Sequence, residues 1–315
     1  MEVERSFYFW KTKGSLSLKE KTALRQLEVK EMFVRFFDVD VSEETKKPQP
    51  LGVLDQADSI AIECKIIPVV FITNRTFLKL TKTEVQELAA NIFKKVNSIH
   101  ENYDELQIDC DWSGTTRENY FFFLKEMKKL LSGKRLSCTI RLHQVKYPIR
   151  SGVPEVDRGM LMFYNMGNVS DVDEVNSIYD PSNAKKYTSY IKSYALPLDV
   201  ALPVFKWLVH YRNGKLEGLI TKHQMPDISN SDFIRTENSA TFKVVNDHLE
   251  RDVFYAKGDV LRLEELTAVQ LKDAALLLHS NLPVENRRVV LYDLDGLNLN
   301  NYEIETIEEV FSVFN

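Results

Sequence analysis

Short apolar segments recur along the chain at intervals that limit which folds it can adopt. Eight of them are rich in Val, Ile, Phe and Leu and are bounded by turn residues, which is the pattern of buried strands. They span residues 7–10, 32–39, 67–73, 105–112, 136–143, 159–165, 200–207 and 289–293. Near-continuous apolar strands indicate a parallel sheet that is covered on its outside.

Helical segments lie between most of these strands. Two begin with a capping box, at Ser17 with Glu20 and at Thr81 with Glu84. We expect further helices over residues 118–131, 187–194, 268–279 and 302–314. Eight strands alternating with helices predict a (β/α)₈ TIM barrel of the α/β class. The alternative is a doubly wound open sheet, which usually carries a glycine-rich first turn that this chain lacks.

Two regions depart from regular repetition. Residues 46–64 follow the second strand without a clear helical pattern, so we expect an irregular second βα unit. The segment between the seventh and eighth strands is long and contains two expected hairpins, around Asn213-Gly214 and around Lys257-Gly258-Asp259. We therefore interpret residues 1–315 as a single barrel domain with a hairpin-rich subdomain, residues 208–264, inserted into it.

Composition excludes several classes of function. With 44% hydrophobic and 28% charged residues the chain is globular, and no apolar run is long enough for a transmembrane segment. A net charge of −5 without a basic block argues against a nucleic-acid partner. The three cysteines lie mostly in apolar runs, and no C-x-x-C or H-x-x-x-H pair occurs. We expect no metal site of this kind and no cofactor.

The start of the chain leaves its location open. Met1 to Arg5 leads directly into an aromatic segment, which is not the pattern of a secretory leader. One interpretation is a cytoplasmic protein. The other is an exported or cell-envelope protein, such as a lipoprotein, whose leader has been removed. The oligomeric state is equally open.

In a barrel of this type the active site lies where the strands end, so the polar residues there are the candidates. Asp109 and Asp111 share one face of the fourth strand, and two buried acids on one face need partners or a function. Their natural partners are Arg141 and His143 on the next strand. A purely structural alternative is an Arg141–Asp109 ion pair that closes the barrel end. The remaining strand-end residues are Asp38, Asn74, Tyr164, Asn165 and Asp293.

Aromatic residues gather at the same strand ends. They are Trp10, Trp112, Tyr164, Trp207 and Tyr292. Flat aromatic faces beside carboxylates and amides are suited to holding sugar rings, because a ring can stack while polar groups bond the hydroxyls. The pattern therefore predicts a carbohydrate ligand.

Two strands resemble motifs of the family 18 glycoside hydrolases, the chitinase-like barrels. Residues 108–113 read I-D-C-D-W-S, similar to the I-D-I-D-W-E of that family's fourth strand. Residues 162–165 read M-F-Y-N, similar to its M-x-Y-D on the sixth strand. The resemblance implies that Asp111 orients a 2-acetamido group, that Asp109 supports it, and that Tyr164 stabilises the developing oxazolinium. The fourth strand is also similar to the Q-I-D-x-D strand of a bacterial, glycosidase-related barrel family of unknown function.

The chain departs from the family 18 pattern at three positions. Ser113 stands where the proton-donating glutamate is expected, and Asn165 stands where an aspartate is expected. Tyr292 replaces the tryptophan of the last strand. Loss of a general acid costs a factor of about 10² to 10⁴ unless another carboxyl substitutes. The candidate substitutes are Asp38, Asp40 and Asp293.

Three functions follow from these patterns. The first is a glycosidase-like barrel that binds, and in one version hydrolyses, a carbohydrate at a cleft centred on Asp109, Asp111 and Tyr164. The second is a carbohydrate-binding or scaffold barrel that has lost its acid. The third is a metal-dependent enzyme using Asp109, Asp111 and His143. For the sugar we predict contacts from Trp10, Asp38, Trp112, Arg141, His143, Asn165, Trp207, Tyr292 and Asp293.

Overall fold

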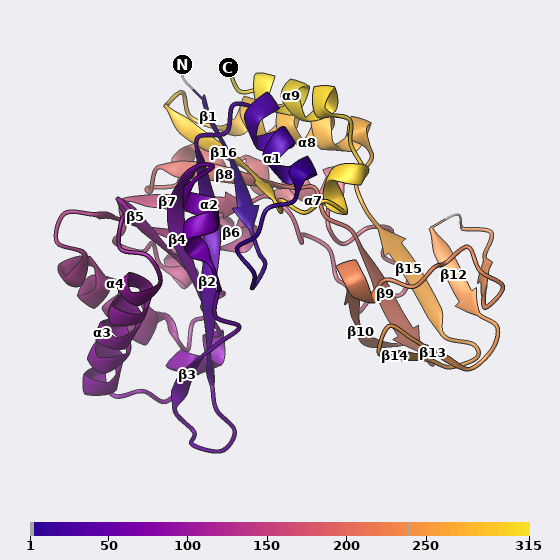
Figure 1. Cartoon of the computed structure of the whole chain (residues 1–315), viewed down its shortest axis with the longest axis horizontal. Coiled ribbons are helices and arrows are strands. Elements are labelled where there is room, and N and C mark those ends of the chain that lie inside the picture. The colour runs from indigo at the N-terminus through magenta and orange to yellow at the C-terminus, as the bar shows by residue number, and fades with distance from the viewer. Residues whose placement is uncertain (1–2, 239) are drawn as a thin grey trace.

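Eight parallel strands form a closed barrel. The computed structural model describes residues 3–238 and 240–315 (Figure 1). They are β1 (Val3–Phe9), β2 (Glu31–Val41), β4 (Lys65–Ile72), β5 (Glu105–Asp109), β6 (Arg135–Arg141), β7 (Arg158–Met162), β8 (Leu198–Pro203) and β16 (Arg287–Tyr292). Their order is β1-β16-β8-β7-β6-β5-β4-β2, and pairing of β1 with β2 closes the ring. The predicted TIM barrel is confirmed.

Helices cover the barrel between the strands. They are α1 (Leu18–Gln26), α3 (Lys82–Ile99), α4 (Arg117–Leu131), α5 (Leu142–Lys146), α6 (Pro148–Ser151), α7 (Pro181–Thr188), α8 (Ala268–Asn281) and α9 (Ile304–Ser312). Both capping boxes expected from the sequence are present, at Ser17 and at Thr81. No helix in the described part of the chain has the length and apolarity needed to cross a membrane.

The helix expected over residues 187–194 is wrong. The true helix, α7, begins earlier, because Asp180 caps it and Pro181 occupies its first turn. It ends at Thr188, and only a short 3₁₀ turn, η2 (Ile191–Ser193), follows. Of the apolar residues in the expected range, Tyr187 lies in α7 and Ile191 in this turn.

The second βα unit is irregular, as predicted. Strand β2 extends beyond the barrel and pairs in antiparallel register with β3 (Pro48–Leu51). The helix that follows, α2 (Ala57–Ala61), has only five residues. The outer layer of the barrel is therefore thin at this point.

The insertion before the last strand forms its own β-structure and projects from one side of the barrel (Figure 1). Its main sheet has the order β10-β9-β15-β12-β11. These strands are β9 (Trp207–Arg212), β10 (Lys215–Thr221), β11 (Phe233–Arg235), β12 (Thr241–Val244) and β15 (Val260–Glu264). The expected hairpin at Asn213-Gly214 is confirmed, and both turn residues have positive φ, as a tight two-residue turn requires.

The second expected hairpin, around Lys257-Gly258-Asp259, is wrong. Strand β14 (Val253–Tyr255) pairs with β13 (His248–Glu250), whereas β15 pairs with β9 and β12. The two segments that flank the turn therefore belong to different sheets. Buried Asp259 holds the turn in this form, because its carboxylate accepts hydrogen bonds from the backbone of Ala256 and from His210.

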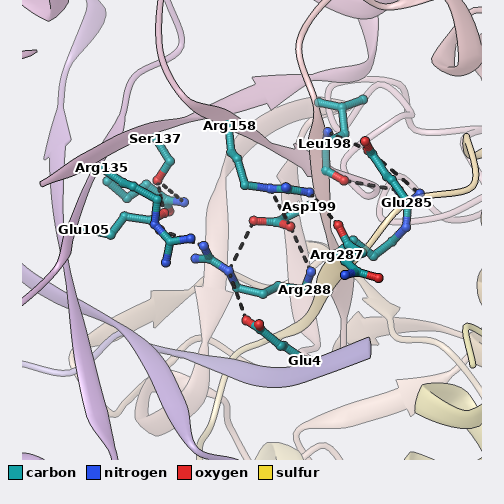
Figure 2. Close-up of polar contacts among 12 residues, drawn as sticks. Glu4, Glu105, Arg135, Ser137, Arg158, Leu198, Asp199, Glu285, Arg287 and Arg288 are labelled. Carbon is teal, nitrogen blue, oxygen red and sulfur yellow. Dashed lines mark hydrogen bonds and ion pairs between the residues drawn. The ribbon is translucent and has the colours of Figure 1, made fainter. Parts of the chain in front are cut away.

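Charged side chains meet inside the barrel at the amino-terminal ends of the strands (Figure 2). Arg288 of β16 is almost fully buried and lies 2.6 Å from Glu105. Its guanidinium also lies 3.3 Å from Glu31 and 3.5 Å from Asp199. Arg288 thus contacts carboxylates from β2, β5 and β8 and connects opposite sides of the barrel.

Strand β5 carries polar residues at alternate positions, all of which face the interior. Glu105 accepts a hydrogen bond from Ser137 of β6, and Gln107 accepts one from Tyr8 across the barrel. The next residue with the same orientation is Asp109, at the carboxyl end of the strand. The strand therefore connects the charged cluster at one end of the barrel to the mouth at the other.

We predict that Arg288→Met destabilises the protein by about 3–5 kcal/mol, because buried Glu105 and Asp199 lose the cation that they share and keep only Arg135 and Arg158 at the edge of the cluster. Urea unfolding near neutral pH measures this loss. Arg135→Met is the control: Arg135 lies 3.2 Å from the same Glu105 but is half-exposed, so its removal should cost about 1 kcal/mol or less. Equal stability of Arg288→Met and the wild type would contradict the assigned role of the cluster.

Candidate functional site

A pocket of about 370 Å³ opens at the carboxyl-terminal mouth of the barrel, and we call it the inner pocket. Its volume lies within the range of about 300–1,000 Å³ typical of small-ligand sites. Most of the lining comes from residues that follow barrel strands, and part comes from the insertion. The lining residues are Trp10, Asp109, Arg141, Met162, Tyr164, Asn165, Phe205, Lys206, Trp207, Thr221, Lys222, Tyr292 and Asp293.

Five aromatic rings of the inner pocket form one continuous wall. Trp10 contacts Tyr292 with 5.5 Å between ring centroids, and Tyr292 contacts Tyr164 at 5.6 Å. Phe205 contacts Tyr164 at 5.7 Å and Trp207 at 5.1 Å. The wall therefore runs past the ends of β1, β16, β7 and β8, and its rings hold one another in place.

Asp109 is the acid at the base of this pocket. Its side chain is held by a 2.7 Å hydrogen bond from the Thr139 hydroxyl, and the residue is only 8% exposed. Burial raises the pKa of Asp109 from its usual value of 3.8 to about 6, against the opposing effect of the nearby Arg141 cation. Near neutral pH this carboxyl therefore takes up a proton more readily than an ordinary aspartate.

Arg141 forms its ion pair with Asp111. The alternative prediction, an Arg141–Asp109 ion pair that closes the barrel end, is wrong. The Arg141 guanidinium donates to both carboxylate oxygens of Asp111, with 2.8 Å between Nη2 and Oδ2. Strand β5 ends at Asp109 and β6 ends at Arg141, so the alternation of faces does not continue past them. His143 consequently lies in α5, on the outer side of the same ion pair.

Asp293 follows the last strand and is fully buried. Lys222 of the insertion donates to its carboxylate at 2.6 Å, and Asn298 donates to the other oxygen at 2.7 Å. Lys222 also lies 3.9 Å from Asp295, which in turn lies 3.3 Å from Lys11. These alternating charges connect the insertion to the barrel beside the pocket.

Trp207 is the first residue of β9 rather than the end of the seventh barrel strand, because β8 already ends at Pro203. Its indole N–H donates to Glu264 at 2.7 Å. Ser177, from the loop after β7, donates to the same buried carboxylate at 2.5 Å. Arg262 holds its other oxygen at 2.8 Å. Glu264 therefore fixes the tryptophan, the insertion and this loop together.

Several predicted site residues lie elsewhere. Trp112 is buried in the core, where it stacks on Tyr120 at 5.1 Å. The carboxylate of Asp38 pairs with Arg35 at 2.5 Å and does not line the inner pocket. The Arg75 guanidinium, which bonds Asp40, holds the pKa of that carboxyl well below its usual range.

The residue at the expected acid position takes part in a local hydroxyl network. The Ser113 hydroxyl lies 2.9 Å from that of Thr115 and 3.3 Å from that of Thr116. Thr116 in turn bonds Asn74, the candidate at the end of the third strand, which therefore does not reach the inner pocket. A carboxyl group is absent from this loop position.

Four lining residues from the region around the insertion were not predicted: Phe205, Lys206, Thr221 and Lys222. Phe205 and Lys206 lay inside the expected strand 200–207, and an earlier strand end at Pro203 would have marked them as strand-end residues. Nothing local marks Thr221 and Lys222, because long-range docking of the insertion brings them to the mouth.

A metal-dependent site has no ligand cluster in this geometry. Within residues 3–238 and 240–315 no three His, Cys, Asp or Glu side chains come together in a way that could hold a metal ion. Asp111 is already engaged by Arg141, and His143 lies outside the inner pocket. The structure therefore does not favour the third function considered from the sequence.

Comparison with solved structures places this architecture among glycosidase barrels. The spore cortex-lytic enzyme SleL of Bacillus cereus aligns with a TM-score of 0.60 and 13% identity over 99% of this chain and 74% of that one. A chitinase from Chromobacterium violaceum aligns with a TM-score of 0.57 and 12% identity, covering 99% and 98%. A fungal endo-β-N-acetylglucosaminidase from glycosyl hydrolase family 18 aligns at 0.53 and 9%, covering 98% and 97%.

The fold is similar to that of the family 18 glycoside hydrolases. No family model and no curated protein matches the sequence itself, and identities this low concern the fold alone. The barrel that the resemblance implied is thus confirmed, and its fold is similar to that of these glycosidases. The roles that the family 18 pattern implies for Asp109, Asp111 and Tyr164 stay predictions.

We predict that the free energy of unfolding of the wild type falls relative to Asp109→Asn as the pH rises from about 4 to above 6. The pKa of Asp109 is raised in the folded state, so folding favours the protonated carboxyl, and this contribution is lost as the pH passes through about 6. The shift corresponds to about 3 kcal/mol. Urea unfolding of both proteins across this pH range measures the difference.

Thr139→Val is the matched control for this titration. Its hydroxyl bond lowers the pKa of Asp109, so removing the bond should raise that pKa and extend the fall in stability to higher pH. Parallel pH profiles for the wild type and Asp109→Asn would show that burial does not perturb this carboxyl.

Proposed function

We propose that the protein binds a carbohydrate in the inner pocket. The observation that carries the proposal is the wall of five contacting aromatic rings, from Trp10 to Trp207, at the mouth of a glycosidase-like barrel. Such a wall offers apolar faces to the C–H groups of a sugar ring. The rings are already packed on one another, so little side-chain freedom is lost when a ligand binds.

Polar groups converge on the same space. Asp109, Arg141, Asn165 and Lys206 line the inner pocket beside the aromatic wall. Together they offer a carboxyl that can donate or accept, a guanidinium, an amide and an ammonium group. A ligand with many hydroxyl groups around an apolar ring matches this mixture better than a purely apolar or a strongly charged ligand does.

Binding without the hydrolysis typical of family 18 is the version that the geometry supports best. The position of the proton donor is Ser113, whose hydroxyl is bonded within its own loop. Asp111, which the resemblance assigns to orienting a 2-acetamido group, is held by two guanidinium nitrogens of Arg141. Neither residue is free to perform the step expected of it.

The test is thermal stabilisation by a panel of soluble glycans, followed by calorimetric titration of any glycan that stabilises the protein. We predict that Trp10→Ala weakens binding roughly tenfold, because about 1–1.5 kcal/mol of stacking is lost. Trp112→Phe is the control: that indole lies in the core, so its loss should change stability but not affinity. The proposal is wrong if no glycan stabilises the protein, or if Trp10→Ala binds as well as the wild type.

Slow hydrolysis is the second candidate function, because the pKa of Asp109 is raised to about 6 and the carboxyl can carry a proton in the pocket. In that case release of reducing ends should decline above about pH 6. Asp109→Asn should reduce it by about 10² or more. Asp38→Asn, outside the inner pocket, should leave it unchanged. Turnover that survives in Asp109→Asn would contradict this role.

A further inference from the structure

The cleft continues beyond the inner pocket. A second cavity of about 370 Å³, which we call the outer pocket, shares Arg141, Tyr164 and Asn165 with the first. Its other lining residues are Asp111, Leu142, His143, Met166 and Tyr187. Because three residues line both cavities, the two cavities are neighbours at the mouth of the barrel.

Three tyrosines surround one lysine where the outer pocket meets the surface. The ammonium of Lys146 lies 5.2 Å from the ring centroid of Tyr187, 5.4 Å from that of Tyr147 and 5.8 Å from that of Tyr190. Tyr147 is 51% exposed and Tyr190 is 41% exposed. Lys146 makes no ion pair with any residue that the structure describes.

Tyr187 packs against the core, whereas Tyr147 and Tyr190 are exposed beside it. Exposed apolar surface that is contiguous and rimmed by polar groups is typical of ligand-binding grooves. Cation–π attraction holds the ammonium among the rings, and none of the described carboxylates pairs with it, so its N–H groups can donate to a ligand. Aromatic faces beside the ammonium of Lys146 resemble the combination of aromatic rings and polar groups in the inner pocket.

We propose that Lys146, Tyr147, Tyr187 and Tyr190 form an outer subsite for further sugar units of the glycan whose terminal unit occupies the inner pocket. The proposal rests on the proposed function and narrows its ligand to a chain of several sugars. The tyrosines stack on sugar rings, and Lys146 donates to their hydroxyl or carboxylate oxygens. The chain passes between the two positions over Arg141 and Asn165, which line both cavities.

The experiment measures affinity against chain length, with N-acetylglucosamine oligomers from the disaccharide to the hexasaccharide as probes. For the wild type the affinity should rise with length. In the double variant Tyr147→Ala/Tyr190→Ala the hexasaccharide should bind roughly tenfold more weakly, while the disaccharide binds as before. Lys146→Met keeps the apolar stem and loses the donors, so it should show a smaller loss of the same kind.

Phe254→Ala is the matched control, because Phe254 is 52% exposed but lies on β14 of the insertion. It should leave every affinity unchanged. Thermal unfolding of all variants checks that the fold is intact. If the wild type binds the disaccharide and hexasaccharide equally, or if the double variant weakens both alike, the outer subsite is wrong while sugar binding stands. If no oligomer binds the wild type, both proposals are overturned for this sugar class.

Discussion

The barrel depends on one buried guanidinium. Glu31, Glu105 and Asp199 turn inward from three strands, and Arg288 is the cation that all three share, while Arg135 and Arg158 each neutralise one of them from the side. The ion pair between Arg288 and Glu105 crosses the barrel and fixes which face of β5 is inside. A slip of β5 by one residue would turn every one of its side chains to the opposite face.

The chemistry of the mouth follows from that register. Because Glu105 is inside, Gln107 and Asp109 are inside as well, and the strand delivers a carboxyl to the base of the inner pocket. Tyr8, which bonds Gln107, packs beneath Trp10 and Tyr292 and supports the aromatic wall from below. The same dry surroundings raise the pKa of Asp109. The inward-facing register of β5 thus places Glu105 in the charged cluster at one end of the barrel and Asp109, with its raised pKa, at the other.

The sequence predicts what depends on local periodicity, and it misses what depends on docking. Trp10, Asp109, Tyr164 and Tyr292 were predicted to meet because each ends a strand, and parallel strands end at one edge. The alternation rule failed for His143, since β6 ends two residues before it. Lys222 could not be predicted, because its ion pair with Asp293 forms only when the insertion folds back onto the barrel.

In the loop after β5, Ser113 stands where the family 18 resemblance implies a proton donor. Ser113 contacts Thr115 and Thr116 through hydroxyl groups, and Thr116 bonds the amide of Asn74. These groups therefore have hydrogen-bond partners without a carboxyl group at position 113. On the opposite wall, Glu264 and Lys222 hold the insertion against the barrel with buried ion pairs and hydrogen bonds. On our proposal the walls that hold the sugar are thus fixed, while a serine stands at the position where the family 18 resemblance implies a proton donor. This contrast favours recognition over turnover as the purpose of the cleft.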